Sequence, residues 1–260
     1  QQMNANESQK IEDKKLISPE EKLEEGIEDV LELTREKRYF LARDKILEFN
    51  AADAAEILKE ITDEIGIEET VIVFRLFPKA RSVDIFAYLP IEDQVAIVDC
   101  ITDMESTYII NELDFDDKID VLEELPANVV DMIMEKTTKN ERKLINTYLN
   151  YPDDCAGSLM TPDYISLFPS MTVGEALEHI KNVGMDAETI YTCYVKDKGR
   201  KLLGIVPLST LVVTDDSIKI ADIMKDDYVW VDVYKDQEEV ADEFKKYGFL
   251  ALPVVDKEHR

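Results

Sequence analysis

Carboxylates are concentrated in one stretch of this chain, residues 103–124, which contains a single base, Lys118. The acids of the stretch are Asp103, Glu105, Glu112, Asp114, Asp116, Asp117, Asp120, Glu123 and Glu124. Hard divalent cations prefer carboxylate oxygen as a ligand. The stretch is therefore a candidate cation site, and its alternative interpretation is a solvated acidic face.

Two of these acids, Asp116 and Asp120, stand four positions apart, so on a helix they share one face. That face is offset from Phe115, Ile119 and Leu122, which we expect to point inward. Like charges at this spacing destabilise a helix unless something offsets them, and a bound dication would do so.

The charge of the whole chain narrows the class of partner. Asp plus Glu number 57 against 30 Lys plus Arg in 260 residues, for a formal net charge of −27. Such a field repels phosphate backbones, so we expect no nucleic-acid partner, and it attracts cations. An acidic surface is equally typical of a soluble protein, so composition alone does not establish metal binding.

Residues for catalysis or for a zinc site are scarce. Cys100, Cys155 and Cys193 are far apart, and His179 and His259 are the only histidines. We therefore predict no zinc site of the usual ligand spacing and interpret the cysteines as core thiols in a reducing compartment. The chain has no G-x-S-x-G, P-loop or G-x-G-x-x-G motif, and we predict that it is not an enzyme.

No run of about 18 apolar residues is present, so none of it is predicted to span a membrane.

The first half of the chain is predicted to be helical. Residues 1–20 are polar, and Ser18 followed by Pro19 predicts a helix start. From 21 to 150, apolar residues recur at three- and four-residue spacing, as in Ile46, Leu47, Ala54, Ile57, Leu58 and Ile61. Segment 77–90 recurs as 113–126, and a period of about 36 with two helices per unit is typical of a helical superhelical repeat.

After residue 150 the pattern changes to alternating strands and amphipathic helices. The predicted helices are 172–184, capped by Thr172, and 236–248, capped by Asp236, with Val240, Phe244 and Tyr247 as the core stripe of the second. The predicted strands are 164–168, 190–195, 202–208 and 228–233. Met160–Tyr164 recurs 64 residues later as Met224–Tyr228, which indicates two copies of one unit, 151–218 and 219–260, the second incomplete.

The repeated unit resembles a tandem pair of CBS (cystathionine β-synthase) modules. It has a Met-Thr-Pro start, a strand, an amphipathic helix and a Leu-Leu-Gly-Ile-Val strand. The junction Tyr151–Pro162, followed by Asp186–Tyr191, resembles the MgtE magnesium-transporter family, and the Leu-Phe-Pro-Lys-Ala repeat resembles that family's acidic N domain. The implied fold is multidomain: an all-α helical repeat domain followed by α/β tandem CBS domains, the second truncated.

The resemblance implies a cytosolic magnesium-sensing region on the cytoplasmic face of the cell membrane, joined to a transmembrane pore domain of the same polypeptide. Mg²⁺ would be both regulatory ligand and transported ion, bridging N-domain and CBS carboxylates in a compact, pore-closing state. We expect a homodimer through the CBS modules, because their faces exceed what one incomplete pair can bury.

Matched position by position, the family's metal ligands fall on five residues. These are Asp84, Asp116, Asp120, Glu238 and the main-chain carbonyl of Lys245. The independent interpretation of Glu238 is stabilisation of a helix N-terminus. Gly248 stands where the family commonly has an acid, and the acidic cluster that usually follows the second module is absent, so we expect weaker interdomain sites.

Two other functions compete with magnesium sensing. A CBS pair that senses adenosine nucleotides usually has an aspartate after the Gly-Ile-Val strand, and this chain has Thr210 there. Phe249 and Ile190 could line an adenine slot but are interpreted as core residues, so the sequence argues against nucleotide binding. A helical-repeat interaction scaffold without a ligand would show no response to cations.

Overall fold

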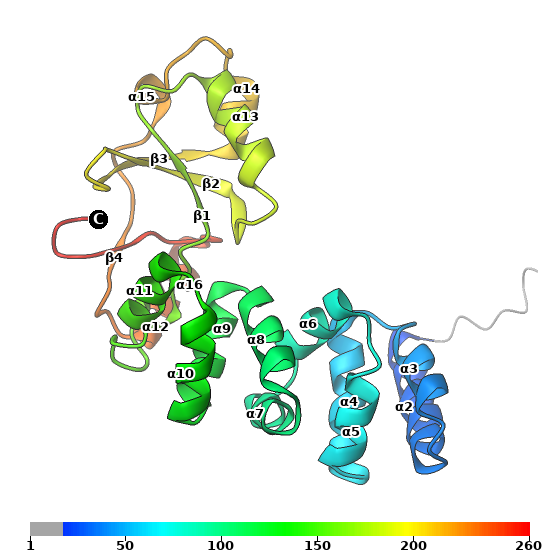
Figure 1. Cartoon of the computed structure of the whole chain (residues 1–260). Helices are drawn as coiled ribbons and strands as arrows, with labels where there is room; N and C mark the ends of the chain where they lie inside the picture. The colour runs from blue at the N-terminus through cyan, green and yellow to red at the C-terminus, as the bar shows by residue number, and fades with distance from the viewer. Residues whose placement is uncertain (1–17) are drawn as a thin grey trace, which may run out of the picture. The chain divides into compact units, whose positions relative to one another are not determined.

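The computed structural model describes residues 18–260 (Figure 1), so most of the polar segment predicted at 1–20 lies outside the described residues. Contacts divide the chain into two compact units. Unit 1 comprises the chain up to Leu113 together with Asp120–Lys136, and unit 2 comprises Asp114–Ile119 together with Thr137–Arg260.

Unit 1 is helical throughout its described residues, as predicted. Its helices are α2 (Pro19–Arg35), α3 (Tyr39–Ile46), α4 (Ala51–Glu64), α5 (Ile67–Phe74), α6 (Lys79–Ala87), α7 (Ile91–Cys100), α8 (Asp103–Glu112), the later part of α9 (Phe115–Glu124) and α10 (Ala127–Lys136). The cap at Ser18 is confirmed, because its hydroxyl accepts from the Glu21 N–H and the Ser18 N–H donates to the Glu21 carboxylate. Pro90 is the N-cap residue of α7, a position whose N–H has no intrahelical partner, so proline costs no hydrogen bond there.

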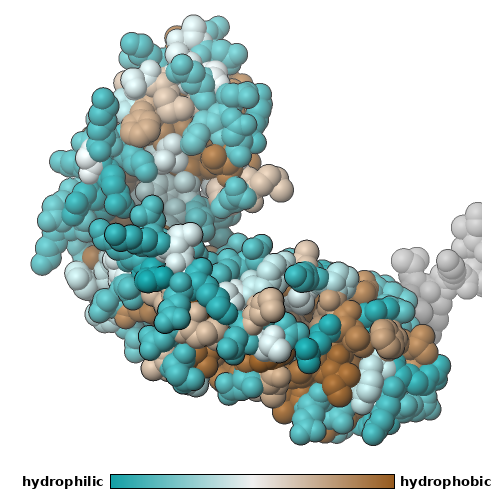
Figure 2. Space-filling model, viewed as in Figure 1, coloured by the Kyte–Doolittle hydropathy of each residue, from teal (hydrophilic) through white to brown (hydrophobic). Residues whose placement is uncertain are grey.

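The core of unit 1 follows the apolar spacing of the sequence. Ile46, Ala54, Ile57, Leu58 and Ile61 are all buried. Burying such side chains is the main stabilising contribution to a helical repeat, because short helices are marginal in isolation. Figure 2 shows apolar residues gathered on part of the visible face of the helical unit, between hydrophilic areas.

Unit 2 contains the α/β half of the chain. Its helices are the first residues of α9, then α11 (Lys139–Tyr148), α12 (Ala156–Leu159), α13 (Val173–Val183), α14 (Leu208–Val213), α15 (Ile220–Ile223) and α16 (Gln237–Tyr247). Its strands are β1 (Tyr164–Leu167), β2 (Thr189–Lys196), β3 (Leu202–Pro207), β4 (Val231–Asp232) and β5 (Val254–Val255). β1 pairs parallel to β2 and β2 antiparallel to β3 (Figure 1). β4 pairs parallel to β5 in a second sheet.

The first strand–helix module matches its prediction closely. Thr172 and Glu175 form the predicted capping box at the start of α13. The apolar face of α13 packs with the sheet into one core that includes Ile165, Val195 and Val206. Cys193 lies in this core, where burial raises the pKa of its thiol to about 12.

Two details depart from the sequence predictions. Cys155 and Cys193 are buried, but Cys100 is exposed at the end of α7, so its assignment as a core thiol was wrong. The strand predicted at 228–233 is reduced to the two residues of β4, because its partner β5 is equally short.

The second module is also less buried than its sequence predicted. Every residue of α16 retains some solvent exposure, and Tyr247, expected in the core stripe, is 44% exposed and stacks on Phe249. The second sheet has only two short strands and offers little surface that could bury a helix. Asp236 caps the helix as predicted, but through the N–H of Glu238.

The junction at 151–157 is fixed by the second module. Gln237 donates its main-chain N–H to the Asp154 carbonyl (2.8 Å) and its side-chain amide to Asp154 Oδ1 (2.7 Å). The N–H of Gly157 donates to the Val233 carbonyl at 2.7 Å. A Cβ at Gly157 would lie 2.8 Å from the Tyr151 ring and 2.9 Å from that carbonyl, so only glycine allows this close approach.

In the part of the chain that the structure describes, no helix is both long and apolar enough to cross a membrane.

Candidate functional site

Helix α9 brings part of the acidic stretch into unit 2. Phe115, Ile119 and Leu122 are buried, as predicted from the spacing. Phe115 packs its ring against Tyr148 of α11, with 4.7 Å between ring centroids, which fixes the first turn of α9 on α11. Asp116 is half-buried, and among the described residues its Oδ1 has no hydrogen-bond partner.

Two further carboxylates stand where strands β1 and β2 begin. Asp163 directly precedes β1 and Glu188 directly precedes β2. The Glu188 N–H donates to the Asp163 carbonyl at 2.8 Å, and the next residues, Tyr164 and Thr189, are paired across the strands. Asp163 and Glu188 therefore lie next to each other at the end of the sheet where β1 and β2 begin.

The charges of α9 act on these two acids. Burial raises the pKa of Asp163, and the negative charges of Asp114 and Asp116 raise it further. Burial likewise raises the pKa of Glu188, followed by the charges of Asp116, Asp114 and Asp163. Glu188 is the more exposed of the two, so solvent screens its interactions more strongly. We call Asp114, Asp116, Asp163 and Glu188 the carboxylate group of unit 2.

Lys118 lies close to this group and was not singled out from the sequence. Its side chain is 6% exposed, and Nζ lies 2.8 Å from Oε1 of Glu141 in the first turn of α11. Its positive charge lowers the pKa of Asp163, against the effect of the neighbouring acids. The sequence showed Lys118 as one base among nine acids, but its ion-pair partner Glu141 lies 23 positions away.

The chemistry of the carboxylate group of unit 2 fits a hydrated divalent cation. Among residues 18–260, no set of three or more Asp, Glu, His or Cys side chains is close enough to hold a metal ion directly. Mg²⁺ commonly keeps several waters and is held by one or two protein carboxylates, so a loose group of oxygens suits it. The buried Oδ1 of Asp116 is an acceptor that such an ion or its water would satisfy.

The residues that the resemblance implied as ligands are distributed over both units. Asp84 is an exposed residue of α6 in unit 1, 3.9 Å from Arg81. Asp120, four positions after Asp116 on α9, is exposed. Their roles as ligands stay predictions.

Glu238 and Lys245 occupy opposite ends of α16. Glu238 is exposed in the first turn, and Lys245 lies in the last turn, where main-chain carbonyls lack intrahelical partners. Seven helical residues separate them by about 10 Å along the axis, so one ion cannot contact both directly.

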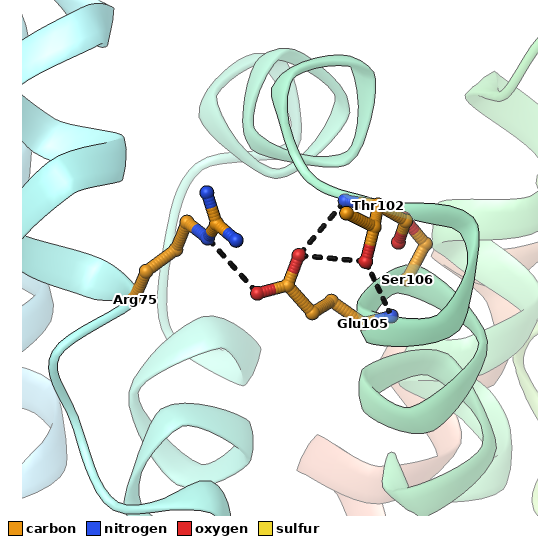
Figure 3. Close-up of polar contacts among 4 residues, drawn as sticks. All are labelled: Arg75, Thr102, Glu105 and Ser106. Carbon is orange, nitrogen blue, oxygen red and sulfur yellow. Dashed lines mark hydrogen bonds and ion pairs between the residues drawn. The ribbon is translucent and has the colours of Figure 1, made fainter.

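Not every acid of the 103–124 stretch is available to a cation. Figure 3 shows Glu105 of α8 accepting from the Thr102 N–H (2.9 Å), the Thr102 hydroxyl (2.8 Å) and Nε of Arg75 (2.9 Å). Burial opposes the ionised form, but these hydrogen bonds outweigh it and lower the pKa of Glu105. Glu105 is a helix cap and an ion-pair partner within unit 1.

Unit 2 also contains a cavity of about 950 Å³. Three cationic side chains, Lys196, Arg200 and Arg260, line it together with the rings of Tyr148 and Tyr151. Asp163 and Glu188 are also part of its wall. The cavity therefore offers aromatic surface together with basic and acidic side chains, and one of the basic ones, Arg260, is ion-paired with Asp256, which also lines the cavity.

Comparison with known proteins identifies two family domains. The MgtE intracellular N domain matches residues 49–154. The CBS domain matches residues 156–214 and again 220–260. The predicted order, a helical domain followed by a CBS pair, is thus confirmed.

A similar protein over nearly the whole chain is the magnesium transporter MgtE of Thermus thermophilus. It is 33% identical over 257 residues, which are 96% of this chain and 53% of that protein. The chain thus spans about half the length of this relative.

Two solved structures share the fold at useful identity. One is the cytosolic domain of the Mg²⁺ channel MgtE in complex with ATP, with a TM-score of 0.80 and 32% identity, covering 90% of this chain and 94% of that one. The other is the soluble part of a magnesium transporter, with a TM-score of 0.77 and 26% identity, covering 92% of each chain.

The ATP complex overturns one expectation. The sequence argued against nucleotide binding because Thr210 stands in place of an aspartate, but a relative 32% identical to this chain binds ATP, so that argument was wrong. It rested on Thr210 and on the interpretation of Phe249 and Ile190 as core residues. Phe249 is in fact exposed, and the cavity of unit 2 combines cations and aromatic rings from several segments. With both family domains in order and a relative of this identity matched over most of both chains, the chain belongs to the MgtE family.

Proposed function

We propose that this chain is the magnesium-sensing regulatory region of a magnesium transporter, and that Mg²⁺ binds at the carboxylate group of unit 2. The observation that carries the proposal is the half-buried Asp116, whose Oδ1 lacks a partner among the described residues while its charge acts on Asp163 and Glu188. The proposed region lies on the cytoplasmic face of the membrane and dimerises through its CBS modules.

The proposed mechanism is electrostatic. Without magnesium, the carboxylates of α9 repel those that precede β1 and β2, since the charges of Asp114 and Asp116 add to the effect of burial in raising the pKa of Asp163. A hydrated Mg²⁺ between them offsets the repulsion and favours the arrangement in which the acids are close. An ion shifts such an equilibrium only by its difference in affinity for the two arrangements, so the close arrangement must bind it more tightly.

The position of the group supports a bridging role. Asp114 and Asp116 fall in the segment that matches the MgtE N domain, and Asp163 and Glu188 fall in the first CBS match. All four belong to one compact unit. An ion bound here would join residues from the two family domains, which is the bridging that the sequence resemblance implied, through a partly different set of acids.

The test compares thermal unfolding in chelator with unfolding in about 10 mM magnesium chloride, a concentration well above the weak-site range. Binding to the folded state raises stability by mass action, so the wild type should gain from magnesium. Asp116→Asn with Asp163→Asn should lose most of that gain. Glu24→Gln with Glu28→Gln, two exposed acids of α2, is the control and should keep it.

A third variant separates the two candidate sets of ligands. Asp84→Asn with Asp120→Asn and Glu238→Gln removes the acids that the resemblance implied. If this variant loses the magnesium gain while Asp116→Asn with Asp163→Asn keeps it, our site assignment is wrong. A wild type without any gain would contradict magnesium sensing by this chain.

Nucleotide binding is a second candidate function, favoured by the cavity of unit 2. Positive side chains and aromatic rings are the groups that bind phosphates and stack on bases. Replacing magnesium chloride by ATP in the same unfolding measurement tests it. An unchanged transition at millimolar ATP would argue against this function.

A further inference from the structure

We propose that Lys118 is a tethered counter-ion of the carboxylate group of unit 2. Its ammonium offsets part of the group's negative charge before any metal ion binds, which holds this region together without magnesium and lowers its affinity for the ion. The inference rests on the proposed function, because it describes how the affinity of the same site is set. Lys118 is a positioning residue that acts through the carboxylates.

The geometry keeps this cation in place. Lys118 is 5% exposed as a residue, so its ammonium is held inside unit 2 and cannot extend into solvent. Glu141 of α11 accepts from its Nζ at 2.8 Å and so anchors the charge. Glu141 is itself fixed, because its main-chain N–H donates to the cap residue Thr138.

The surroundings of Lys118 are strongly acidic. Asp114 and Asp116 belong to the same turn of chain, and Asp163 and Glu188 face them from the sheet edge. Asp186 adds a further negative charge near Asp163. In the set of charges that act on Asp163, Lys118 is the base that opposes these acids.

A structural role alone would not call for a lysine here. Positions 115, 119 and 122 of the same helix are apolar and buried, so an apolar residue at 118 would extend their surface. A buried ion pair is often no more stabilising than apolar residues of similar volume, because both charges must be desolvated. The carboxylates nearby give the buried charge a use that the pair with Glu141 does not supply.

The test is Lys118→Met, which keeps the apolar stem and removes the charge. Calorimetric titration with magnesium chloride should show an affinity about five- to ten-fold higher than wild type, because one positive charge no longer repels the dication at short range. Lys143→Met removes the same charge from an exposed position of α11 and should leave the affinity unchanged.

Glu141→Gln separates this role from a simple ion pair. It removes the negative charge that pairs with Lys118, so more of the ammonium's charge acts on the carboxylate group, and magnesium affinity should fall, opposite in sign to Lys118→Met. If the pair were only structural, both variants would lose stability and neither would bind magnesium more tightly. An affinity for Lys118→Met equal to or below that of wild type overturns the proposal.

A second readout does not need magnesium. In chelator, Lys118→Met leaves the carboxylates mutually repelling, and added sodium chloride screens that repulsion. Its melting temperature should therefore rise more steeply with salt than that of Lys143→Met. If wild type binds no magnesium, the proposed function fails, but a steeper salt response still supports the counter-ion role. Equal salt responses overturn it.

Discussion

Glu105 in unit 1 and Asp163 in unit 2 are carboxylates of the same acidic chain in opposite surroundings. Glu105 receives hydrogen bonds from Thr102 and Arg75 on both of its oxygens (Figure 3), and its pKa is lowered. Asp163 is partly buried near Asp114 and Asp116, and its pKa is raised. Glu105 thus already accepts hydrogen bonds on both oxygens, whereas Asp163 lies near other negative charges.

This difference separates acids that stabilise the fold from acids that could bind a cation. A carboxylate whose oxygens accept from an N–H, a hydroxyl and a guanidinium gains little from a metal ion. The ionised form of a carboxylate close to other carboxylates is destabilised unless a cation is bound near it. Net charge cannot make this distinction, because both kinds contribute equally to the value of −27.

The largest expected effect is the loss of the Glu105 contacts. Glu105→Ala removes one half of the capping box at α8 and the ion pair with Arg75. We expect the free energy of unfolding to fall by about 1 kcal/mol, mostly from the cap, because an exposed ion pair contributes little. Glu112→Ala, an exposed acid of the same helix, is the control for removing a negative charge. Urea unfolding followed by circular dichroism would show the contrast, and equal losses would mean that the cap is unimportant.

The pH dependence should differ in sign between the two regions. The pKa of Glu105 is lowered in the folded state, so its contribution is present above the unfolded value of about 4.3 and is lost as pH falls through the folded pKa. The pKa of Asp163 is raised, so its ionisation weakens the folded state, and this penalty disappears below the unfolded value of about 3.9.

Two isosteric variants make that comparison measurable in chelator from pH 7 to pH 3. Wild type should be more stable than Glu105→Gln at pH 7, with the gap closing toward pH 3. Asp163→Asn should be more stable than wild type at pH 7, and that gap should also close on acidification. Gaps of the same sign at pH 7 would remove the distinction between the two regions.

Local sequence patterns predicted the helices and their caps well, because these features depend on residues that are close in the chain. The spacing of Ile57, Leu58 and Ile61 is enough to identify the buried face of α4, and the Thr172 capping box marks the start of α13. The strand at 228–233 failed, because a strand exists only as far as its partner extends, and β5 has two residues.

The site was predicted less well, because its properties depend on contacts between distant segments. Glu105 and Asp116 belong to the same acidic stretch and look alike in the sequence. Glu105 is satisfied by Arg75, 30 positions earlier, while Asp116 faces acids from the strand edges. Lys118 is likewise paired with a distant residue, Glu141 of α11.

The smallest expected effect separates two aspartates of one helix. Asp116 and Asp120 share a face of α9, but Asp120 is exposed, whereas Asp116 has a buried oxygen with no partner in the described part of the chain. In chelator, Asp116→Ala should stabilise the protein by a few tenths of a kcal/mol, because it relieves like-charge repulsion and removes an unsatisfied acceptor. Asp120→Ala relieves the same repulsion but also removes another interaction that Asp120 makes, so we expect a change near zero. Magnesium should then favour the other variant. On addition of excess magnesium, Asp116→Ala should gain less stability than Asp120→Ala, because it lacks the proposed ligand. Differential scanning calorimetry of both variants in both buffers measures the four values. A greater loss of magnesium gain in Asp120→Ala would place the ion on the exposed face of α9 and away from the carboxylate group of unit 2.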